Sequence, residues 1–193
     1  MKVLLLFSHP VEASYGAALH IKAREALVRA GHDVDDCDLY AEGFDPVLSR
    51  EDRLIYHTIP DNRAKVSSYC DRLTAAEALV IVTPVWNFGF PAMLKGYFDR
   101  VWLPGVSFDL ADGKLQSRLQ HIKKLGAVLT YGSTQFGAFL AGNPPKKIVK
   151  RVLRAQINPM GSVKFLAHYD MNNSTPDTRA RFLKDVGDAM ERF

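Results

Sequence analysis

Residues 83–101 read TPVWNFGFPAMLKGYFDRV, and this segment places large apolar side chains where a solvated loop is expected. A short apolar run at 79–82 precedes the segment and predicts a buried parallel strand. Pro84 is expected to end this strand, and Pro91 suits the first turn of a following helix. Residues 85–90 are therefore predicted to connect a buried strand to a helix.

Three aromatic side chains stand in this connection: Trp86, Phe88 and Phe90. Open α/β sheets bind ligands at the carboxyl ends of their strands, so these rings could form the wall of a site for a flat, apolar ligand. They could equally pack beneath their own loop or against another subunit. This segment alone supports both interpretations.

The chain as a whole is expected to form one domain, residues 1–193. A hydrophobic content of 47% is enough for a substantial core, and no Gly-, Ser- or Pro-rich linker divides the sequence. The longest apolar runs, near 3–7 and 79–82, are far too short to span a membrane, and residues 1–2 lead directly into a strand instead of a signal peptide. We therefore expect a cytoplasmic protein without a membrane span.

Two features that often mark binding sites have simpler explanations in this sequence. Cys37 and Cys70 lack the spacing of a metal site and are expected in the core, and the acids between 33 and 38 fit an exposed strand edge, so no metal is predicted. The net charge of +4 comes partly from basic residues at helical spacing: Lys147, Lys150, Arg151 and Arg154. This helix face is expected to be solvated or to contact an anionic partner such as a nucleotide phosphate, and no nucleic-acid partner is predicted.

Strand and helix signals alternate along the chain. Strands are expected at 2–7, 33–39, 79–82, 125–130 and 163–167. Helices are expected from the first loop to about 30, from the turn at 45–46 to about 78, over 93–102, over 146–157 and from 175 onward. This alternation predicts an α/β fold: a flavodoxin-like three-layer sandwich around a five-stranded parallel sheet of order 2-1-3-4-5.

Three loops are expected to meet in this strand order. The switch point lies between the first and third strands, so the loops at 8–16 and 85–90 face each other across one crevice. The loop after the fourth strand, 131–142, joins them. Three distant segments of the sequence would then build one site.

The first of these loops, SHPVEASYG, ends at a helix N-terminus, where free N–H groups and the helix dipole favour an anion such as a phosphate. Ser14 can supply a hydroxyl, Gly16 allows close backbone approach, and His9 can donate a hydrogen bond or carry a positive charge. Alternatively, Ser14 is only an N-cap and His9 serves only the local backbone.

The third loop, TYGSTQFGAFLAG, is rich in glycine and small polar residues, which suits backbone donors at the polar edge of a ligand; an ordinary flexible connection is the alternative. A phosphate anchor, an aromatic wall and a polar edge together describe a flavin nucleotide. The sequence has no G-x-G-x-x-G after the first strand, no G-x-x-x-x-G-K-[ST] and no G-x-S-x-G. A Rossmann dinucleotide site, phosphoryl transfer and a serine nucleophile elbow are therefore not predicted.

With these loops assigned, the chain resembles the flavodoxin-like NAD(P)H:quinone oxidoreductase family over nearly its whole length, as a short, single-domain member. The matching segments are LLFSHPxxAS at 5–14, DLYAEGFDPVLS at 38–49 and PVWNFGFPAMLKGYFDRV from 84. The resemblance implies a non-covalent flavin, either FMN or FAD, that NAD(P)H reduces and that passes electrons to a quinone or a similar acceptor. It also implies a homodimer with the flavin near the subunit interface.

The resemblance also assigns individual residues. The predicted flavin-binding residues are His9, Ser14, Tyr15, Gly16, Pro84, Val85, Trp86, Asn87, Phe88, Tyr131, Gly132, Ser133 and Thr134. Trp86 and Phe88 are expected to shape the slot that reductant and acceptor share, and backbone N–H groups from 132–134 are expected to stabilise the negative charge of the reduced ring. No catalytic side chain is assigned, because the flavin carries the hydride chemistry.

Two positions depart from the family pattern. Many members have an aromatic residue and then Asn after the phosphate-loop Ser, whereas here Gly16 follows Tyr15. Longer members place a Tyr and a His in the fourth-strand loop, where this chain has Phe136, Phe139 and Asn143, so proton transfer by such a pair is not expected. A flavin-binding regulatory or electron-transfer module, for example a transporter partner subunit, is the alternative function.

Overall fold

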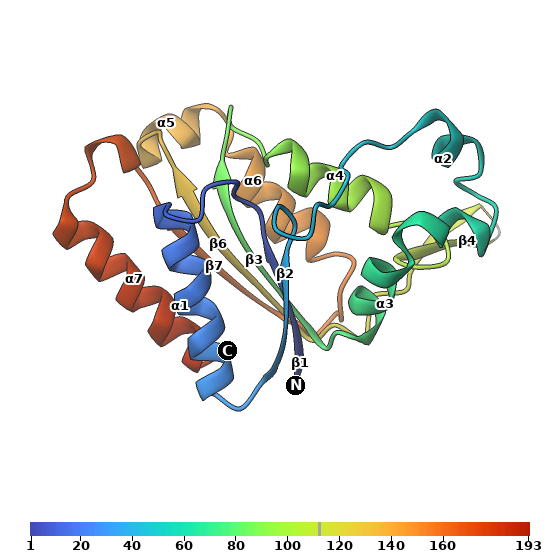
Figure 1. Ribbon diagram of the computed structural model, residues 1–193, viewed down its shortest axis with the longest axis horizontal. Coiled ribbons are helices and arrows are strands. Elements are labelled where there is room, and N and C mark those ends of the chain that lie inside the picture. Colours follow the sequence, from blue (N-terminus) through green and yellow to red (C-terminus); the bar gives the residue numbers. More distant parts are fainter. Residues whose placement is uncertain (112) are drawn as a thin grey trace.

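A five-stranded parallel sheet forms the centre of the molecule (Figure 1). The computed structural model describes residues 1–111 and 113–193. In spatial order the sheet strands are β2 (Asp33–Asp38), β1 (Lys2–Phe7), β3 (Ala78–Val85), β6 (Lys124–Tyr131) and β7 (Ser162–His168), and all neighbours pair in parallel. Counted along the chain, these strands have the order 2-1-3-4-5, so the predicted flavodoxin-like α/β fold is confirmed.

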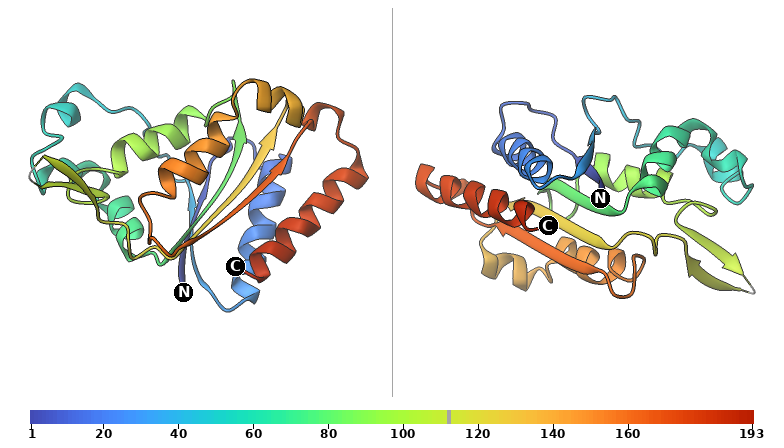
Figure 2. Two further views of the ribbon diagram at one scale, coloured as in Figure 1. Left: turned by 180° about the vertical axis from the view of Figure 1, so that it is seen from behind. Right: turned by 90° about the horizontal axis from the view of Figure 1, so that it is seen from below.

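Alternate side chains of each strand point to opposite faces of the sheet and build two separate cores. Val3, Leu5 and Phe7 of β1 pack with α1 (Tyr15–Arg29) and α7 (Pro176–Glu191), which lie side by side in Figures 1 and 2. Leu4 and Leu6 point to the other core. That core also takes buried side chains from α3 (Ser67–Ala75), α4 (Ala92–Val101), α5 (Gln135–Leu140) and the π-helical η2 (Ile148–Leu153).

The single helix predicted from 45–46 to about 78 is wrong. This stretch contains the short helix α2 (Arg50–Leu54), the 3₁₀ helix η1 (Asp61–Val66) and then α3. Pro60, just before η1, has no N–H to donate and disfavours helical backbone at the residue before it, so a continuous helix does not pass this point. The predicted core positions of Cys37 and Cys70 are confirmed, because both side chains are buried.

The chain around β3 and β6 also differs from the prediction. β3 does not end at Pro84 but continues to Val85. Pro84 pairs with Thr130 of β6, and Val85 pairs with Tyr131. Proline lacks only the N–H, and its fixed φ is compatible with an extended chain, so the strand continues through it. The predicted loop at 131–142 contains α5, whose N-cap is Thr134.

The helix predicted at 146–157 both begins and ends earlier. It starts as α6 (Pro144–Lys147), because proline suits a helical first turn, where the N–H groups have no partner in the helix. η2 then continues the helix to Leu153.

The antiparallel pair β4 (Phe108–Ala111) and β5 (Lys114–Ser117) was not predicted. Each strand has four residues, which is too short for a clear alternation signal.

Several predicted boundaries are confirmed. Gly31, just after α1, has a φ of 81°, and Thr175 is the N-cap of α7. β2 is an edge strand, as its acids predicted, and Asp35 pairs with Arg72 of α3 at 2.8 Å. Within residues 1–111 and 113–193, no helix combines the length and apolarity that crossing a membrane requires.

Candidate functional site

A cavity of about 320 Å³ lies at the carboxyl edge of the sheet, beside the switch point between β1 and β3. Its walls come from the connections that follow β1, β3, β6 and β7. The lining residues are His9, Ser14, Tyr15, Gly16, Pro84, Val85, Trp86, Thr130, Gly132, Met171 and Asn172. The structure therefore brings together predicted residues from all three loops and adds a fourth segment after β7.

The N-terminus of α1 opens onto this cavity. Ser14 is its N-cap, and the Ser14 Oγ accepts the N–H of Ala17 at 3.1 Å, which leaves the hydroxyl proton to be donated. The first turn of α1 contains no acid, and no acceptor in the described chain receives the N–H groups of Tyr15 and Gly16. Free N–H groups at the positive end of a helix dipole favour an anion here.

His9 lines the cavity and keeps one ring nitrogen free of partners within the described residues. Its Nδ1 accepts the backbone N–H of Val11 at 3.0 Å, so the neutral ring carries its proton on Nε2 and can donate it. The His9 ring also meets the Trp86 ring edge-on, with the centroids 5.9 Å apart. This contact joins the loop after β1 to the loop after β3.

Two glycines of the cavity wall leave space that the protein does not fill. A Cβ on Gly16 would lie 3.6 Å from both the His9 ring and the Ser14 Oγ, and one on Gly132 would lie 3.6 Å from the Asn172 amide. These are ordinary contact distances, and neither glycine has a positive φ. Neither packing nor backbone conformation requires glycine at these positions, and the missing side chains leave room for a ligand to approach the backbone closely.

The connection after β3 is a tight two-residue turn. Trp86 and Gly89 exchange backbone hydrogen bonds of 3.1 and 2.9 Å, and the residues between them, Asn87 and Phe88, have φ values of 49° and 57°. Both values are positive, as in a type I′ turn, which Asn tolerates and a bulky aromatic residue does not. The strain at Phe88 is of the kind that collects at functional sites.

The aromatic residues of this connection fall into two groups. Phe90 is half-buried: its ring packs against the core, with its centroid 6.0 Å from that of Phe98, and it also lines an apolar groove beside α4. Trp86 and Phe88 are 43% and 42% exposed. These two rings therefore remain available to a ligand or to another subunit.

Tyr15 lines the cavity with its ring, but its hydroxyl is occupied elsewhere. The hydroxyl donates to the carbonyl of Arg179 in α7 at 2.7 Å, and burial raises the pKa of Tyr15 to about 12. His168 packs edge-on to the Tyr15 ring at 5.9 Å and does not line the cavity. Tyr15 thus holds α1 against α7 while its ring forms part of the wall.

Tyr131 lies on the opposite face of the sheet from the cavity. Thr130 lines the cavity, and because side chains alternate along β6, Tyr131 points into the other core. Its hydroxyl donates to the Oδ1 of Asn143 at 2.9 Å, and burial raises its pKa well above the usual value. Tyr131 therefore supports the site from behind.

Four other predicted residues lie outside the cavity lining: Asn87, Phe88, Ser133 and Thr134. The Ser133 carbonyl accepts the N–H of Asp170 at 2.8 Å, and the Thr134 hydroxyl accepts the N–H of Gly137 at 3.1 Å. In the part of the chain that the structure describes, the backbone N–H groups of Gly132, Ser133 and Thr134 meet no acceptor. This turn therefore carries free donors next to the cavity.

Three lining residues were not predicted: Thr130, Met171 and Asn172. Strand alternation could have identified Thr130, because it is the last residue of β6 on the face of α1. The segment after β7 could have been found from the strand order, which places the end of β7 next to the end of β6. Met171 and Asn172 carry no sequence motif that would mark them.

The chemistry available from the protein at this cavity is limited. The ionisable side chains in its lining are His9 and Tyr15, and the Tyr15 proton is already donated. Over the described ranges, no group of three or more His, Cys, Asp or Glu side chains could hold a metal ion. The site offers an anion position, apolar rings and backbone donors, which suits binding and orienting a ligand that carries its own reactivity.

The sequence matches the Flavodoxin_2 family, described by its flavodoxin-like fold, over residues 1–190. The uncharacterized NAD(P)H oxidoreductase YcaK of Escherichia coli (strain K12) is 34% identical over 112 residues, covering 55% of each protein. The FMN-dependent NADH:quinone oxidoreductase of Beijerinckia indica subsp. indica is 34% identical over 117 residues, covering 60% of this chain and 55% of that protein. The matches span about half the length of these two relatives.

A solved structure resembles the whole chain. The NAD(P)H:quinone oxidoreductase from Methanothermobacter marburgensis is 26% identical, with a TM-score of 0.81 over 100% of this chain and 96% of that one. The sheet order and the family match over residues 1–190 agree with this similarity. The chain therefore belongs to the Flavodoxin_2 family, and its homologues include NAD(P)H:quinone oxidoreductases.

Proposed function

We propose that the chain is a flavin-dependent oxidoreductase that transfers hydride from NAD(P)H to a quinone or a similar acceptor. The observation that carries this proposal is the cavity between the loops after β1 and β3, which combines a helix N-terminus with the exposed ring of Trp86. The printed names of the relatives support it, and one of them specifies FMN. We therefore propose FMN as the cofactor.

The residues of the cavity fit a flavin nucleotide. The N–H groups of Tyr15 and Gly16 and the hydroxyl of Ser14 would hold the phosphate, with Nε2 of His9 as a further donor. The open positions at Gly16 and Gly132 would allow the backbone to approach the ligand. These groups form the proposed phosphate end of the site.

The proposed ring end of the site lies at Trp86 and the turn that follows β6. When bound, the flavin supplies the hydride-accepting and hydride-donating chemistry. The Trp86 and Phe88 rings would shape an apolar slot for the reductant and the acceptor in turn. The free N–H groups of Gly132, Ser133 and Thr134 would stabilise negative charge at the slot's polar edge.

Two measurements on the purified protein test this function. The visible absorption spectrum, followed by chromatography of the released cofactor, is expected to show FMN. Steady-state oxidation of NADPH or NADH with a soluble quinone is expected to show turnover, and Trp86→Ala is expected to lower both flavin affinity and rate. A colourless protein that neither FMN nor FAD restores would contradict the proposal, and bound flavin without turnover would favour a flavin-binding regulatory or electron-transfer module instead.

We also propose that two copies of this chain pair. The support is an apolar groove of about 470 Å³ between α4 and η2, whose lining includes Phe98, Trp102, Leu115 and Val152. Leu115 and Val152 are 63% and 54% exposed. Light scattering coupled to gel filtration is expected to report a dimer that Val152→Glu dissociates, because the variant places a charge in the apolar contact. A monomeric parent protein would contradict this pairing.

A further inference from the structure

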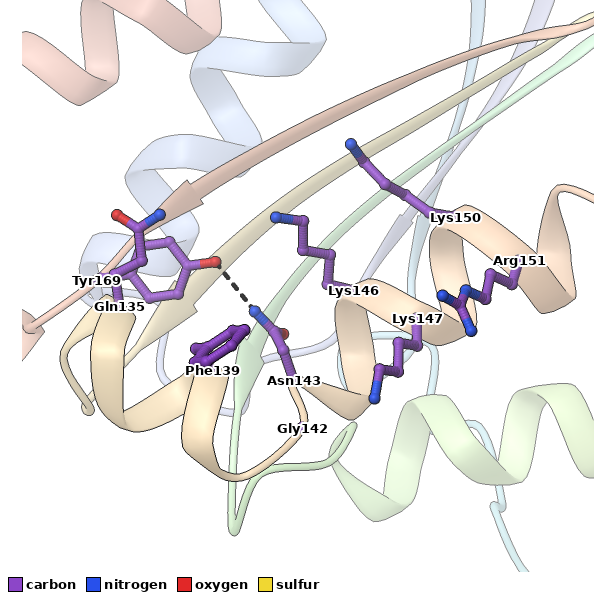
Figure 3. A pocket seen from close by; sticks show the side chains of 9 residues that line it. All are labelled: Gln135, Phe139, Gly142, Asn143, Lys146, Lys147, Lys150, Arg151 and Tyr169. Atoms are coloured by element: carbon purple, nitrogen blue, oxygen red, sulfur yellow. Dashed lines mark hydrogen bonds between the residues drawn. The ribbon is translucent and has the colours of Figure 1, made fainter.

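A second cavity, of about 330 Å³, lies on the other face of the sheet between α5, the α6–η2 helix and the end of β7 (Figure 3). Its lining residues are Gln135, Phe139, Gly142, Asn143, Lys146, Lys147, Lys150, Arg151 and Tyr169. Four of these side chains are cationic and none is acidic. We call this cavity the basic pocket.

The cations of the basic pocket have no acidic partners. In the part of the chain that the structure describes, the ion pairs involve other residues, and no carboxylate lies within 4.0 Å of Lys146, Lys147, Lys150 or Arg151. The Lys146 and Lys150 ammonium groups lie 5.9 and 6.0 Å from the centroid of the Phe165 ring. Four positive charges around one concave surface repel each other and raise the local concentration of anions.

A chain of two hydrogen bonds at the basic pocket ends at the Tyr169 hydroxyl. Tyr131 donates to the Oδ1 of Asn143 at 2.9 Å. The Nδ2 of Asn143 in turn donates to the Tyr169 hydroxyl at 3.3 Å, as Figure 3 shows. Because the Tyr169 hydroxyl accepts this bond, its own proton is free for a ligand. Together with the ammonium and guanidinium groups, this set matches the oxygen atoms of a phosphate.

An apolar surface adjoins these donors. The Phe139 side chain is 72% exposed and borders the basic pocket, as Figure 3 shows. The Tyr169 ring provides a second flat surface. A nucleotide, whose ribose carries both a phosphate and an aromatic base, satisfies both the donors and the rings, whereas a free inorganic anion satisfies only the donors.

The basic pocket is close to the proposed flavin site along two separate connections. Tyr169 of the basic pocket is two residues from Met171 of the flavin site, and Gln135 is three residues from Gly132. Consecutive Cα atoms are about 3.8 Å apart, so these pairs of Cα atoms lie within roughly 8 and 11 Å. A single extended dinucleotide can therefore reach from one site to the other.

We propose that the basic pocket binds the phosphorylated adenosine end of NADPH, so that the chain prefers NADPH to NADH. The two dinucleotides differ only in the 2′-phosphate, which is the group that the unpaired cations and the Tyr169 hydroxyl would recognise. This inference rests on the proposed function for the identity of the ligand. The binding of the oxidised dinucleotides tests it without requiring turnover or a quinone.

Isothermal titration calorimetry of the purified protein with NADP⁺ and NAD⁺ is the experiment. NADP⁺ is expected to bind about tenfold or more tightly than NAD⁺. The double variant Lys146→Gln/Arg151→Gln is expected to bring this ratio close to one. The charge-matched control, Arg181→Gln/Lys184→Gln on the exposed side of α7, is expected to keep the ratio of the parent protein.

Three results would overturn the inference: equal affinity of the parent for NADP⁺ and NAD⁺, an unchanged ratio in the double variant, and inorganic phosphate binding as tightly as NADP⁺. The last would show an anion site without recognition of the nucleotide. A preference for NADP⁺ in a protein that lacks quinone reductase activity would support the basic pocket while contradicting the proposed function. The two proposals therefore fail in different measurements.

Discussion

The backbone of Phe88 shows how one residue can trade stability for a binding surface. With a φ of 57°, this residue adopts a conformation that costs a non-glycine residue roughly 1–2 kcal/mol, while its ring stays 42% exposed. The preceding residue, Asn87, has a similar φ but a side chain that tolerates it. An exposed, strained aromatic residue contributes little to folding, so a ligand or a partner subunit is the better explanation for its presence.

Phe88→Gly is therefore expected to raise the free energy of unfolding by about 1 kcal/mol, because glycine adopts a positive φ without strain. The same variant is expected to weaken flavin binding, because the slot loses one ring. Chemical denaturation and flavin titration measure the two effects. Asn87→Gly is the control, with a smaller gain in stability and unchanged flavin affinity; a Phe88→Gly protein less stable than the parent would show that packing of this ring outweighs the strain.

The N-terminus of α1 combines a structural and a proposed functional role in one element. Ser14 caps the helix, and the N–H groups of Tyr15 and Gly16 remain free beside it. The sequence left open whether Ser14 is only a cap. The structure confirms the cap and places it in the cavity wall, so the two roles have to be separated by experiment.

Ser14→Ala is expected to lower the free energy of unfolding by about 1 kcal/mol and to weaken flavin binding, because it removes both the cap and the hydroxyl. Ser14→Asp is expected to keep the stability of the parent, since Asp also caps helices, but to weaken flavin binding further by repelling the phosphate. Chemical denaturation and flavin titration again provide the readouts.

Ser49→Ala serves as the matched control for this pair. Ser49 caps α2, which lies at the far end of the molecule from α1 (Figure 1), and it is not part of the cavity lining. Its loss is expected to reduce stability without changing flavin affinity. If Ser14→Asp binds flavin as tightly as the parent, no phosphate lies at the end of α1.

At the scale of the whole molecule, the strand order determines which loops meet. The same sheet carries both cores, so the faces covered by α1 and by α4 are expected to unfold together. Residues 1–193 are therefore predicted to unfold in a single transition. Scanning calorimetry checks this, and two resolved transitions would contradict a single domain.

Partly buried tyrosines make the stability of the whole molecule depend on alkaline pH. Burial raises the pKa of Tyr15 and of Tyr69 to about 12, above the value of about 10 in the unfolded chain. Between these values the unfolded chain has lost protons that the folded chain still holds, so the stabilisation is complete below pH 10 and is lost as the pH rises toward 12.

Denaturation with urea from about pH 8 to about pH 11 is expected to show a free energy of unfolding that declines above pH 10. Tyr15→Phe is expected to lose the hydrogen bond to Arg179, at a cost of about 1 kcal/mol at neutral pH, and to show a shallower decline in alkali. A decline of the same steepness in this variant would exclude Tyr15 as a contributor.

How far the sequence predicts each helix or strand depends on the length of the residue pattern that marks it. The five sheet strands, the C-terminal end of α1 and the N-terminal end of α7 follow from apolar runs and capping residues that act locally. The sequence analysis did not predict the helix break at Pro60 or the short antiparallel pair of β4 and β5, because short segments are fixed by their tertiary contacts more than by propensity. For the site, the loops after β1, β3 and β6 were predicted, whereas the loop after β7 was not.

The sequence by itself determined the parallel sheet, its order and the loops that face each other, because apolar periodicity and helix caps are local and the handedness of the connections leaves few topologies. Only the tertiary structure decided which residues of the segment after β7 reach the cavity and which aromatic residues are buried. It also gathered four cations without acidic partners into one pocket. These features depend on contacts between segments far apart in the sequence, which no local pattern encodes.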